Sequence, residues 1–359
     1  MPSEEPFCGA TLENVRTYYF LNLQGLIDIP ICIIGVIFNM FNMLVFTRRN
    51  MISPVNLIFM HLAFANLSEL LAFITSTWAY LAYHSKQSTY EDWTYTRAFV
   101  LMSSAELTSI FNRISAYIVM MLVIWKYIAV FHPSKGSQWC NMKTTRNMVV
   151  TGYIVCVLLY IPEYLSHYIK TLIMHPTTTV YLYSIETHSI MYSASQFIKI
   201  VLHELLPSLV LLILGVRLIV SLWMKKEHPT PTSNVENRSD NVEMKQQTSR
   251  SIIISLVIVA QCLSVEIPTG SLDLVARIVS AVDYYSIHYE CVTSFKVILY
   301  LLDCVNKSIK FIVYFAMDQD FRDAFKSLFN KNNAFFWKLK YVPLSSTIGN
   351  DESLEIDRI

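Results

Sequence analysis

Long apolar stretches decide the fold, and residues 97–133 are the clearest of them: RAFVLMSSAELTSIFNRISAYIVMMLVIWKYIAVFHP. A helix needs roughly 20 mostly apolar residues to cross the hydrocarbon of a bilayer, and this stretch exceeds that length. Similar stretches recur along the chain. Together they lie near 24–47, 55–83, 97–130, 146–170, 192–223, 250–276 and 290–316. The sequence therefore predicts an all-α membrane protein, a seven-transmembrane helix bundle that occupies residues 24–316.

The composition agrees with a membrane protein and argues against other classes. Apolar residues make up 53% of the chain and charged residues only 15%, whereas soluble domains carry about 25% charged residues. The net charge of +1 argues against nucleic acid as a partner, because such a partner needs a basic surface. The cysteines show no CxxC pair or metal-type spacing, so we expect no metal and no cofactor. The chain lacks a nucleophile elbow and an HExxH motif, so we expect no catalytic residue and no enzyme.

The loops between the apolar stretches differ in their content of lysine and arginine. The first, third and fifth loops are basic, with Arg48, Lys143 and Lys225 among their cations, and the other loops are poor in them. Basic loops stay in the cytoplasm. We therefore expect a multi-pass plasma-membrane protein with an extracellular tail at residues 1–23 and a cytoplasmic tail at residues 331–359.

Three shorter segments have their own patterns. The polar residues near 226–249 predict a flexible third cytoplasmic loop. Apolar residues recur at helical spacing from Phe321 to Phe329, which predicts an amphipathic helix at residues 317–330 lying on membrane lipid. A β-prone run at 177–189 predicts a hairpin that acts as a lid over a cavity.

Several short motifs resemble those of one receptor family. Residues 125–133, WKYIAVFHP, resemble the Asp-Arg-Tyr-x-Ala-x-x-His-Pro stretch of rhodopsin-like (class A) G-protein-coupled receptors. Residues 62–67, LAFANL, are similar to the family's Leu-Ala-x-Ala-Asp-Leu run. In the sixth stretch, residues 265–270, VEIPTG, resemble receptors for FMRFamide-like peptides and myosuppressins and the nematode serpentine receptor class w. Residues 306–314, NKSIKFIVY, resemble that subfamily's Asn-Ser-Ser-x-Asn-Phe-x-x-Tyr.

This resemblance covers about residues 20–330 and implies a function. It implies a receptor for an extracellular peptide, FMRFamide-like, that signals through a heterotrimeric G protein. The residues that it assigns to coupling and activation are Lys126, Tyr127, Tyr314, Pro268, Asn66 and Lys310. Two alternatives stay open: a chemosensory receptor for a small molecule, and a non-signalling ligand scavenger with the receptor fold.

The chain departs from the family pattern at two places inside the bundle, at Trp125 with Lys126 and at Asn66 with Lys310. Trp125 and Lys126 replace the family's Asp-Arg, so the acid of the resting-state ion pair is missing. Either Lys126 still contributes to coupling with the G protein, or its ammonium snorkels to the lipid headgroups. Asn66 stands where the family has a sodium-binding aspartate. We hypothesise that Lys310 supplies a tethered positive charge there, the alternative being that Lys310 snorkels as well. The acids considered as its partner are Glu266, Asp303 and Glu69.

The extracellular disulfide of the family is also missing, because residues 171–192 contain no cysteine. Cys8 and Cys291 are the clearly extracellular cysteines of the predicted topology. Either these two form a bond that ties the tail over the pocket, or Cys8 is a free thiol.

Polar residues inside apolar stretches indicate a ligand site, because lipid penalises them. The candidate ligand-binding residues are Glu266, Asp273, Asp303, Lys296, Tyr300, Thr108, Asn112 and His203. Glu266 and Asp273 are seven residues apart and share one helix face. An acidic cavity suits the arginine of an FMRFamide-like peptide. The alternative for each acid is an internal bond between helices.

Overall fold

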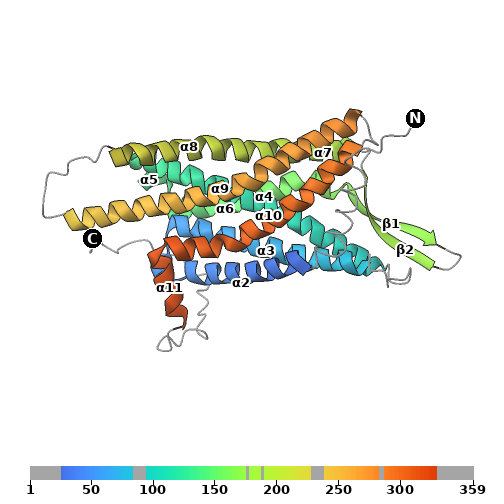
Figure 1. The fold of residues 1–359 in the computed structure, drawn as a ribbon, viewed down its shortest axis with the longest axis horizontal. Helices are drawn as coiled ribbons and strands as arrows, with labels where there is room; N and C mark the ends of the chain where they lie inside the picture. The colour runs from blue at the N-terminus through green and yellow to red at the C-terminus, as the bar shows by residue number, and fades with distance from the viewer. Residues whose placement is uncertain are drawn as a thin grey trace, which may run out of the picture.

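The computed structural model describes residues 26–83, 94–174, 178–186, 190–227, 238–282 and 287–329. Long helices run side by side along one axis (Figure 1). A two-stranded hairpin projects at one end of the bundle, called the hairpin end below, and the short helix α11 lies across the axis at the other, the α11 end. The tails expected at 1–23 and 331–359 lie outside the described residues.

The long helices follow the predicted apolar stretches, and the prediction of an all-α membrane bundle is confirmed. They are α2 (Ile29–Phe46), α3 (Pro54–Tyr83), α4 (Tyr95–Phe131), α6 (Met142–Tyr164), α7 (Ile190–Ile198), α8 (Leu206–Glu227), α9 (Arg238–Val282) and α10 (Ile287–Met317). The π-helix η4 (Lys199–Leu205) joins α7 to α8 in one continuous segment. The short helices are η2 (Arg49–Met51), α5 (Pro133–Trp139) and α11 (Gln319–Phe329). Among the described residues, 6 helical segments are long and apolar enough to cross a membrane.

The helix α10 differs from those segments in its charge. Its 31 residues exceed the length of roughly 20 that a bilayer requires, but Asp303, Lys307 and Lys310 lie in its middle. Charged groups facing hydrocarbon cost several kcal/mol, on the order of 3 per group by insertion measurements. Both lysines are only 4% exposed. The helix packs between α9 and α2, so its charged face is turned into the protein.

The connection between α8 and α9 is shorter than the sequence indicates. Residues 226–249 are expected as a flexible loop, but α8 continues to Glu227 and α9 already begins at Arg238. Residues 228–237 lie outside the described residues. The run at 243–247, EMKQQ, consists of good helix formers. It extends an existing helix and so avoids the unfavourable nucleation step, which a polar composition alone does not reveal.

The hairpin consists of β1 (His167–Met174) and β2 (Thr178–Ile185) in antiparallel register, with Leu172 opposite Val180. The strand β2 coincides with the predicted β-prone run. The strand β1 takes residues expected at the end of the fourth apolar stretch, because α6 ends at Tyr164, two residues after Pro162. A proline inside a helix removes a backbone hydrogen bond and weakens the turn in which it lies.

A buried carboxylate ties this hairpin to the bundle. Glu106 of α4 is 4% exposed and accepts hydrogen bonds from the hydroxyl of Tyr160 on α6 and, at 3.4 Å, from that of Tyr183 on β2. The imidazole Nδ1 of His167 on β1 also contacts this carboxylate. Hydrogen bonds to a charged group are about twice as strong as those between neutral groups. Three elements therefore meet on a single side chain.

Aromatic packing closes the α11 end. The ring of Tyr314 lies 5.1 Å from the rings of Phe46 and Phe59 and 5.6 Å from that of Phe321. Phe321 is fully buried and anchors α11, which lies within the expected range 317–330. Arg322 donates hydrogen bonds to the carbonyls of Phe315 and Ala316, which are left open at the end of α10.

Two glycines lie where neighbouring helices approach each other to different extents. A Cβ at Gly152 would lie 2.0 Å from the ring of Tyr117 on α4, whereas at Gly215 the nearest atom, on Val259, is at 3.6 Å. Gly152→Ala should lower the free energy of unfolding by about 1–3 kcal/mol through overpacking. Gly215→Ala should leave it unchanged or raise it by up to about 1 kcal/mol through helix propensity. Thermal unfolding of the two purified variants measures the difference, and equal midpoints would contradict this packing.

Candidate functional site

A cavity of about 270 Å³ lies among α3, α4, η4, α9 and α10, in the half of the bundle nearer the hairpin end. Its described lining is unusually charged for a membrane interior. The carboxylates are Glu69, Glu204, Glu266, Asp273 and Asp303, and the cations are Arg113, Lys199 and Lys307. Among these residues the carboxylates outnumber the cations by two.

The inner wall is held by Lys307. Its ammonium forms ion pairs with Glu69 of α3 and with Asp303 one turn earlier on α10, and donates to Asn112 of α4 at 3.1 Å. Its backbone carbonyl accepts a hydrogen bond of 3.1 Å from Asn39 of α2. One residue thus connects four helices. We call Glu69, Lys307 and Asp303 the inner bridge.

The opposite wall has a second bridge of the same kind. The ammonium of Lys199 lies 2.7 Å from Asp273 of α9 and 3.5 Å from Glu204. Lys199 and Glu204 are five residues apart, and the π-helix that contains them pairs residue i with residue i+5. That geometry places both side chains on the same face. We call Asp273, Lys199 and Glu204 the outer bridge.

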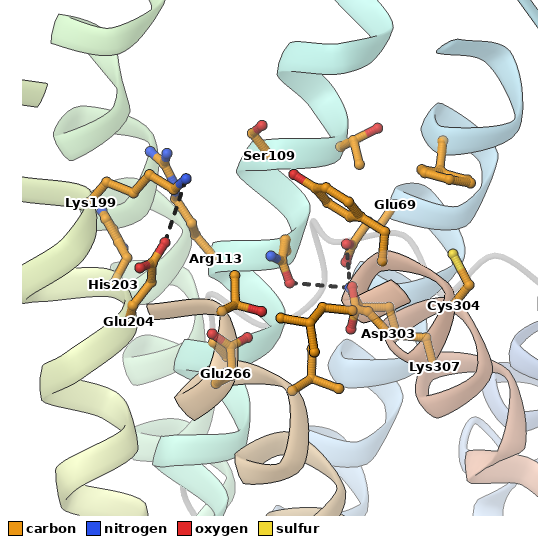
Figure 2. A pocket seen from close by; sticks show the side chains of 18 of the residues that line it. Glu69, Ser109, Arg113, Lys199, His203, Glu204, Glu266, Asp303, Cys304 and Lys307 are labelled. Atoms are coloured by element: carbon orange, nitrogen blue, oxygen red, sulfur yellow. Dashed lines mark hydrogen bonds and ion pairs between the residues drawn. The ribbon is translucent and has the colours of Figure 1, made fainter. Parts of the chain in front are cut away.

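Two cavity residues stand apart from both bridges. Glu266 of α9 forms no hydrogen bond or close ion pair with any described residue, and Figure 2 shows it between Lys199 and Glu204 on one side and Asp303 and Lys307 on the other. His203 is 7% exposed, and its Nε2 has no hydrogen-bond partner among the described residues. Buried polar groups in folded proteins are normally paired. These two groups are therefore available to a ligand.

The third cation of the lining is already compensated. Arg113 pairs with Glu163 of α6, which does not line the cavity, and its guanidinium lies 4.5 Å from the ring centroid of Tyr160. The charge of Arg113 is thus balanced outside the cavity. Among the described lining residues, acidic side chains remain more numerous than lysines.

The structure brings most of the predicted ligand residues together. Those lining the cavity are Glu266, Asp273, Asp303, Tyr300, Thr108, Asn112 and His203. The side chain of Lys296 lies outside the described residues, as do Cys8 and the side chain of Cys291. Sequence reasoning did not single out Lys199 and Lys307. The i, i+4 spacing of Asp303 and Lys307 within an apolar stretch was an available signal for the inner bridge.

Lys310 does not have the partner expected for it. Its ammonium donates to the amide oxygen of Asn66 at 3.4 Å, and Ser115 donates to the same oxygen at 2.9 Å. The acids Glu69 and Asp303 pair with Lys307 instead. The two lysines are three residues apart, so Lys307 lies about 4.5 Å nearer the acids along the helix axis. Lys310 is buried in the bundle, so it does not snorkel.

Three of the residues predicted for coupling, Lys126, Tyr127 and Tyr314, lie toward the α11 end. Lys126 is 8% exposed and donates to Ser251 of α9 at 2.6 Å, which joins α4 to α9 through a neutral acceptor. Trp125 donates from its indole nitrogen to Thr145 of α6 at 3.0 Å. Tyr127 accepts a hydrogen bond of 3.2 Å from Arg217 of α8. Tyr314 lies in the aromatic cluster described above, and Pro268 lies within α9 beside the cavity residue Glu266.

Lys307 and Lys310 form a matched pair for mutation. Lys307→Met leaves Glu69 and Asp303 buried without their cation and should destabilise the protein by about 3–5 kcal/mol. Lys310→Met removes an ammonium whose acceptor is a neutral amide and should leave stability equal or higher. Thermal unfolding of the purified variants tests this. A Lys310→Met protein as unstable as Lys307→Met would contradict it, whereas Glu69→Gln with Asp303→Asn should rescue Lys307→Met.

Comparison with known proteins gives related receptors and a matching family. The chain is 20% identical over 337 residues to the sex peptide receptor of Drosophila melanogaster, covering 90% of this chain and 74% of that receptor. It is 28% identical over 170 residues to the G-protein coupled receptor dmsr-1 of Caenorhabditis elegans, covering 46% of this chain and 33% of the relative. The model of the family "Serpentine type 7TM GPCR chemoreceptor Srw" matches residues 26–332. The chain is therefore a G-protein-coupled receptor and belongs to the serpentine Srw family.

Proposed function

We propose that this chain is a plasma-membrane receptor for a neuropeptide of the FMRFamide-like type, with its N-terminus outside, and that it signals through a heterotrimeric G protein. The observation that carries the proposal is Glu266, an acidic side chain in the lining of an acid-rich cavity that has no hydrogen-bond or ion-pair partner among the described residues. A peptide arginine supplies the missing partner through charge-assisted, bidentate hydrogen bonds.

The two bridges favour Glu266 over the other candidate acids. Asp303 already pairs with Lys307 and Asp273 with Lys199, so a ligand cation would have to compete with a resident ammonium at either place. At Glu266 it gains a full ion pair without that competition. Tyr300, in the same lining, offers an aromatic face to the phenyl ring of the peptide.

A relative supports a peptide as the ligand class. The sex peptide receptor matches over 90% of this chain, and its name assigns it a peptide. The hairpin adds a strand-rich surface at the same end of the bundle as the cavity. Peptide ligands pair readily with such backbone.

A small-molecule chemoreceptor is the second candidate, and two observations favour it. The matching family is described as a chemoreceptor family. The cavity volume of about 270 Å³ is also slightly below the roughly 300–1,000 Å³ typical of sites for drug-sized ligands, so a small molecule fits it more completely than a whole peptide does. For a peptide, only the end that carries the arginine and the aromatic ring needs to enter.

A peptide library applied to cells that express this chain with a promiscuous Gα separates these candidates. Arg-Phe-amide peptides should give a response, and Glu266→Gln should weaken it roughly tenfold or more, the value of a lost charged hydrogen bond. Asp323→Asn is the matched control, because that carboxylate lies exposed on α11 and pairs only at 3.8 Å with Lys326. A response to small molecules but to no peptide would favour the chemoreceptor.

The contact between Lys126 and Ser251 predicts the basal activity. Receptor activation shifts an equilibrium between two states, and this hydrogen bond between α4 and α9 holds the state described here. Ser251→Ala should therefore raise signalling without ligand by roughly two- to tenfold. Ser255→Ala is the control one turn away, since Ser255 donates only within its own helix, to the carbonyl of Ser251. Unchanged basal signalling in Ser251→Ala, with peptide bound but no response, would instead support a non-signalling scavenger.

A further inference from the structure

Two cysteines from different helices meet beside the cavity. Cys32 lies near the start of α2 and Cys304 in the middle of α10, and both are free thiols, 0% and 5% exposed. Their side chains share a hydrogen bond and pack with Leu70 of α3 in a small cluster of their own. A buried cysteine often serves only as a small apolar side chain. Here, however, the two sulfur atoms that a disulfide requires already lie next to each other.

The backbones behind these thiols are held at close range. The hydroxyl of Ser308 donates to the carbonyl of Cys304 at 2.7 Å and to that of Ile31, the residue before Cys32, at 3.2 Å. A Cβ at Gly35 would lie 2.2 Å from the same hydroxyl, so a larger residue there would push α2 away from α10. A disulfide forms only where the two Cα atoms are within roughly 7 Å of each other. The glycine permits this close approach one turn away from the pair.

The cavity gives a reagent access to one of the two sulfurs. Among the described lining residues, Cys304 is the one that carries a thiol, and Figure 2 shows it near Asp303 and Lys307 of the inner bridge. Buried cysteines are usually inert, because reactivity requires an accessible thiolate. Under the proposed orientation this half of the bundle faces the outside of the cell, which is an oxidising compartment. The position of Cys304 therefore distinguishes this pair from an ordinary buried contact.

We propose that Cys32 and Cys304 are a redox-active pair, which a small extracellular disulfide oxidises through the cavity, and that the bond they form fixes α10 to α2. The thiolate of Cys304 attacks one sulfur of the small disulfide, which breaks its S–S bond, forms a mixed disulfide and releases one thiol. Cys32 then attacks the Sγ of Cys304, closes the bond between the two cysteines and releases the second thiol. The protein thiols lose two electrons, the small disulfide gains them, and the two protons end on the released thiols.

The new bond acts on the wall of the cavity. Cys304 directly follows Asp303 and lies three residues before Lys307, so the segment that becomes tied to α2 also carries the inner bridge. Receptor activation shifts an equilibrium between two states, and a covalent tie between helices favours the arrangement in which it forms. Oxidation therefore favours the state described here and lowers the response to a ligand. This effect on signalling rests on the proposed function, since it concerns the regulation of that site.

Peptide mass spectrometry of the purified full-length receptor tests the bond itself without requiring signalling. The reagent is oxidised mercaptoethanol, a small uncharged disulfide. Treated receptor should yield a crosslinked pair of peptides, containing Cys32 and Cys304, that separates after reduction. If Cys140, a partly exposed thiol, carries the reagent while Cys32 and Cys304 both stay free, the inference is overturned.

Thermal unfolding of variants assigns the bond to this pair. Oxidation should raise the unfolding midpoint of the unmodified receptor by roughly 5 °C or more, and reduction should reverse the shift. Cys32→Ala and Cys304→Ala should each abolish the shift, and in Cys32→Ala the mixed disulfide should remain on Cys304. Cys156→Ala is the matched control, because that thiol is 3% exposed but lies on α6, and it should keep the full shift. A shift that survives in both pair variants would overturn the inference, because another bond would then cause it.

Signalling separates this inference from the proposed function. In cells that respond to an Arg-Phe-amide peptide, the reagent should lower the response severalfold, and the Cys304→Ala receptor should be insensitive to it. A crosslink that forms in a receptor silent toward every peptide would overturn the peptide proposal but keep the redox-active pair. A crosslink that leaves the peptide response unchanged would keep the receptor function and overturn the effect of oxidation on signalling.

Discussion

The ammonium group of Lys307 is the interaction on which the hairpin-end half of the bundle depends. It lies between Glu69 of α3, Asp303 of α10 and Asn112 of α4, while its carbonyl binds Asn39 of α2. In hydrocarbon none of these charges is tolerable alone, so the helices that carry them must assemble. The charge that makes α10 a poor membrane span by composition thereby gives it a specific place in the bundle.

The two halves of the bundle are stabilised by different forces. Toward the α11 end, Tyr314, Phe46 and Phe321 pack ring against ring in an apolar core. Toward the hairpin end, ion pairs and the hydrogen bonds of Glu106 take over, and a cavity remains. Removing one partner of a buried ion pair leaves an uncompensated charge, so the hairpin-end half depends on matched charges, whereas the other half depends on close packing. The hydrogen bond from Lys126 to Ser251 lies between the cavity and the α11 end, so a shift of α9 relative to α4 would change its length.

The site was predictable in part, and the reason lies in helix periodicity. Glu266 and Asp273, or Tyr300 and Asp303, fall on one face by spacing alone, and all of them line the cavity. Pairing was not predictable, because it depends on how neighbouring helices are rotated and shifted. Asp303 therefore met Lys307 and not Lys310, although both lysines lie within two turns of it. The π-helix that aligns Lys199 with Glu204 has no signature in a sequence read at the α-helical period.

By itself the sequence determined which segments lie in the membrane, because roughly 20 apolar residues in a row have no stable alternative once inserted. It also determined the amphipathic helix after α10 and the β-prone strand of the hairpin, since local periodicity defines both. Only the tertiary structure decided that β1 replaces the end of the fourth apolar stretch and that α9 begins at Arg238. It also decided that, among the predicted acids of the cavity, Glu266 alone has no close partner among the described residues. These outcomes depend on contacts between segments distant in the chain, and the energy of a buried charge is set by its neighbours in space and not by its neighbours in sequence.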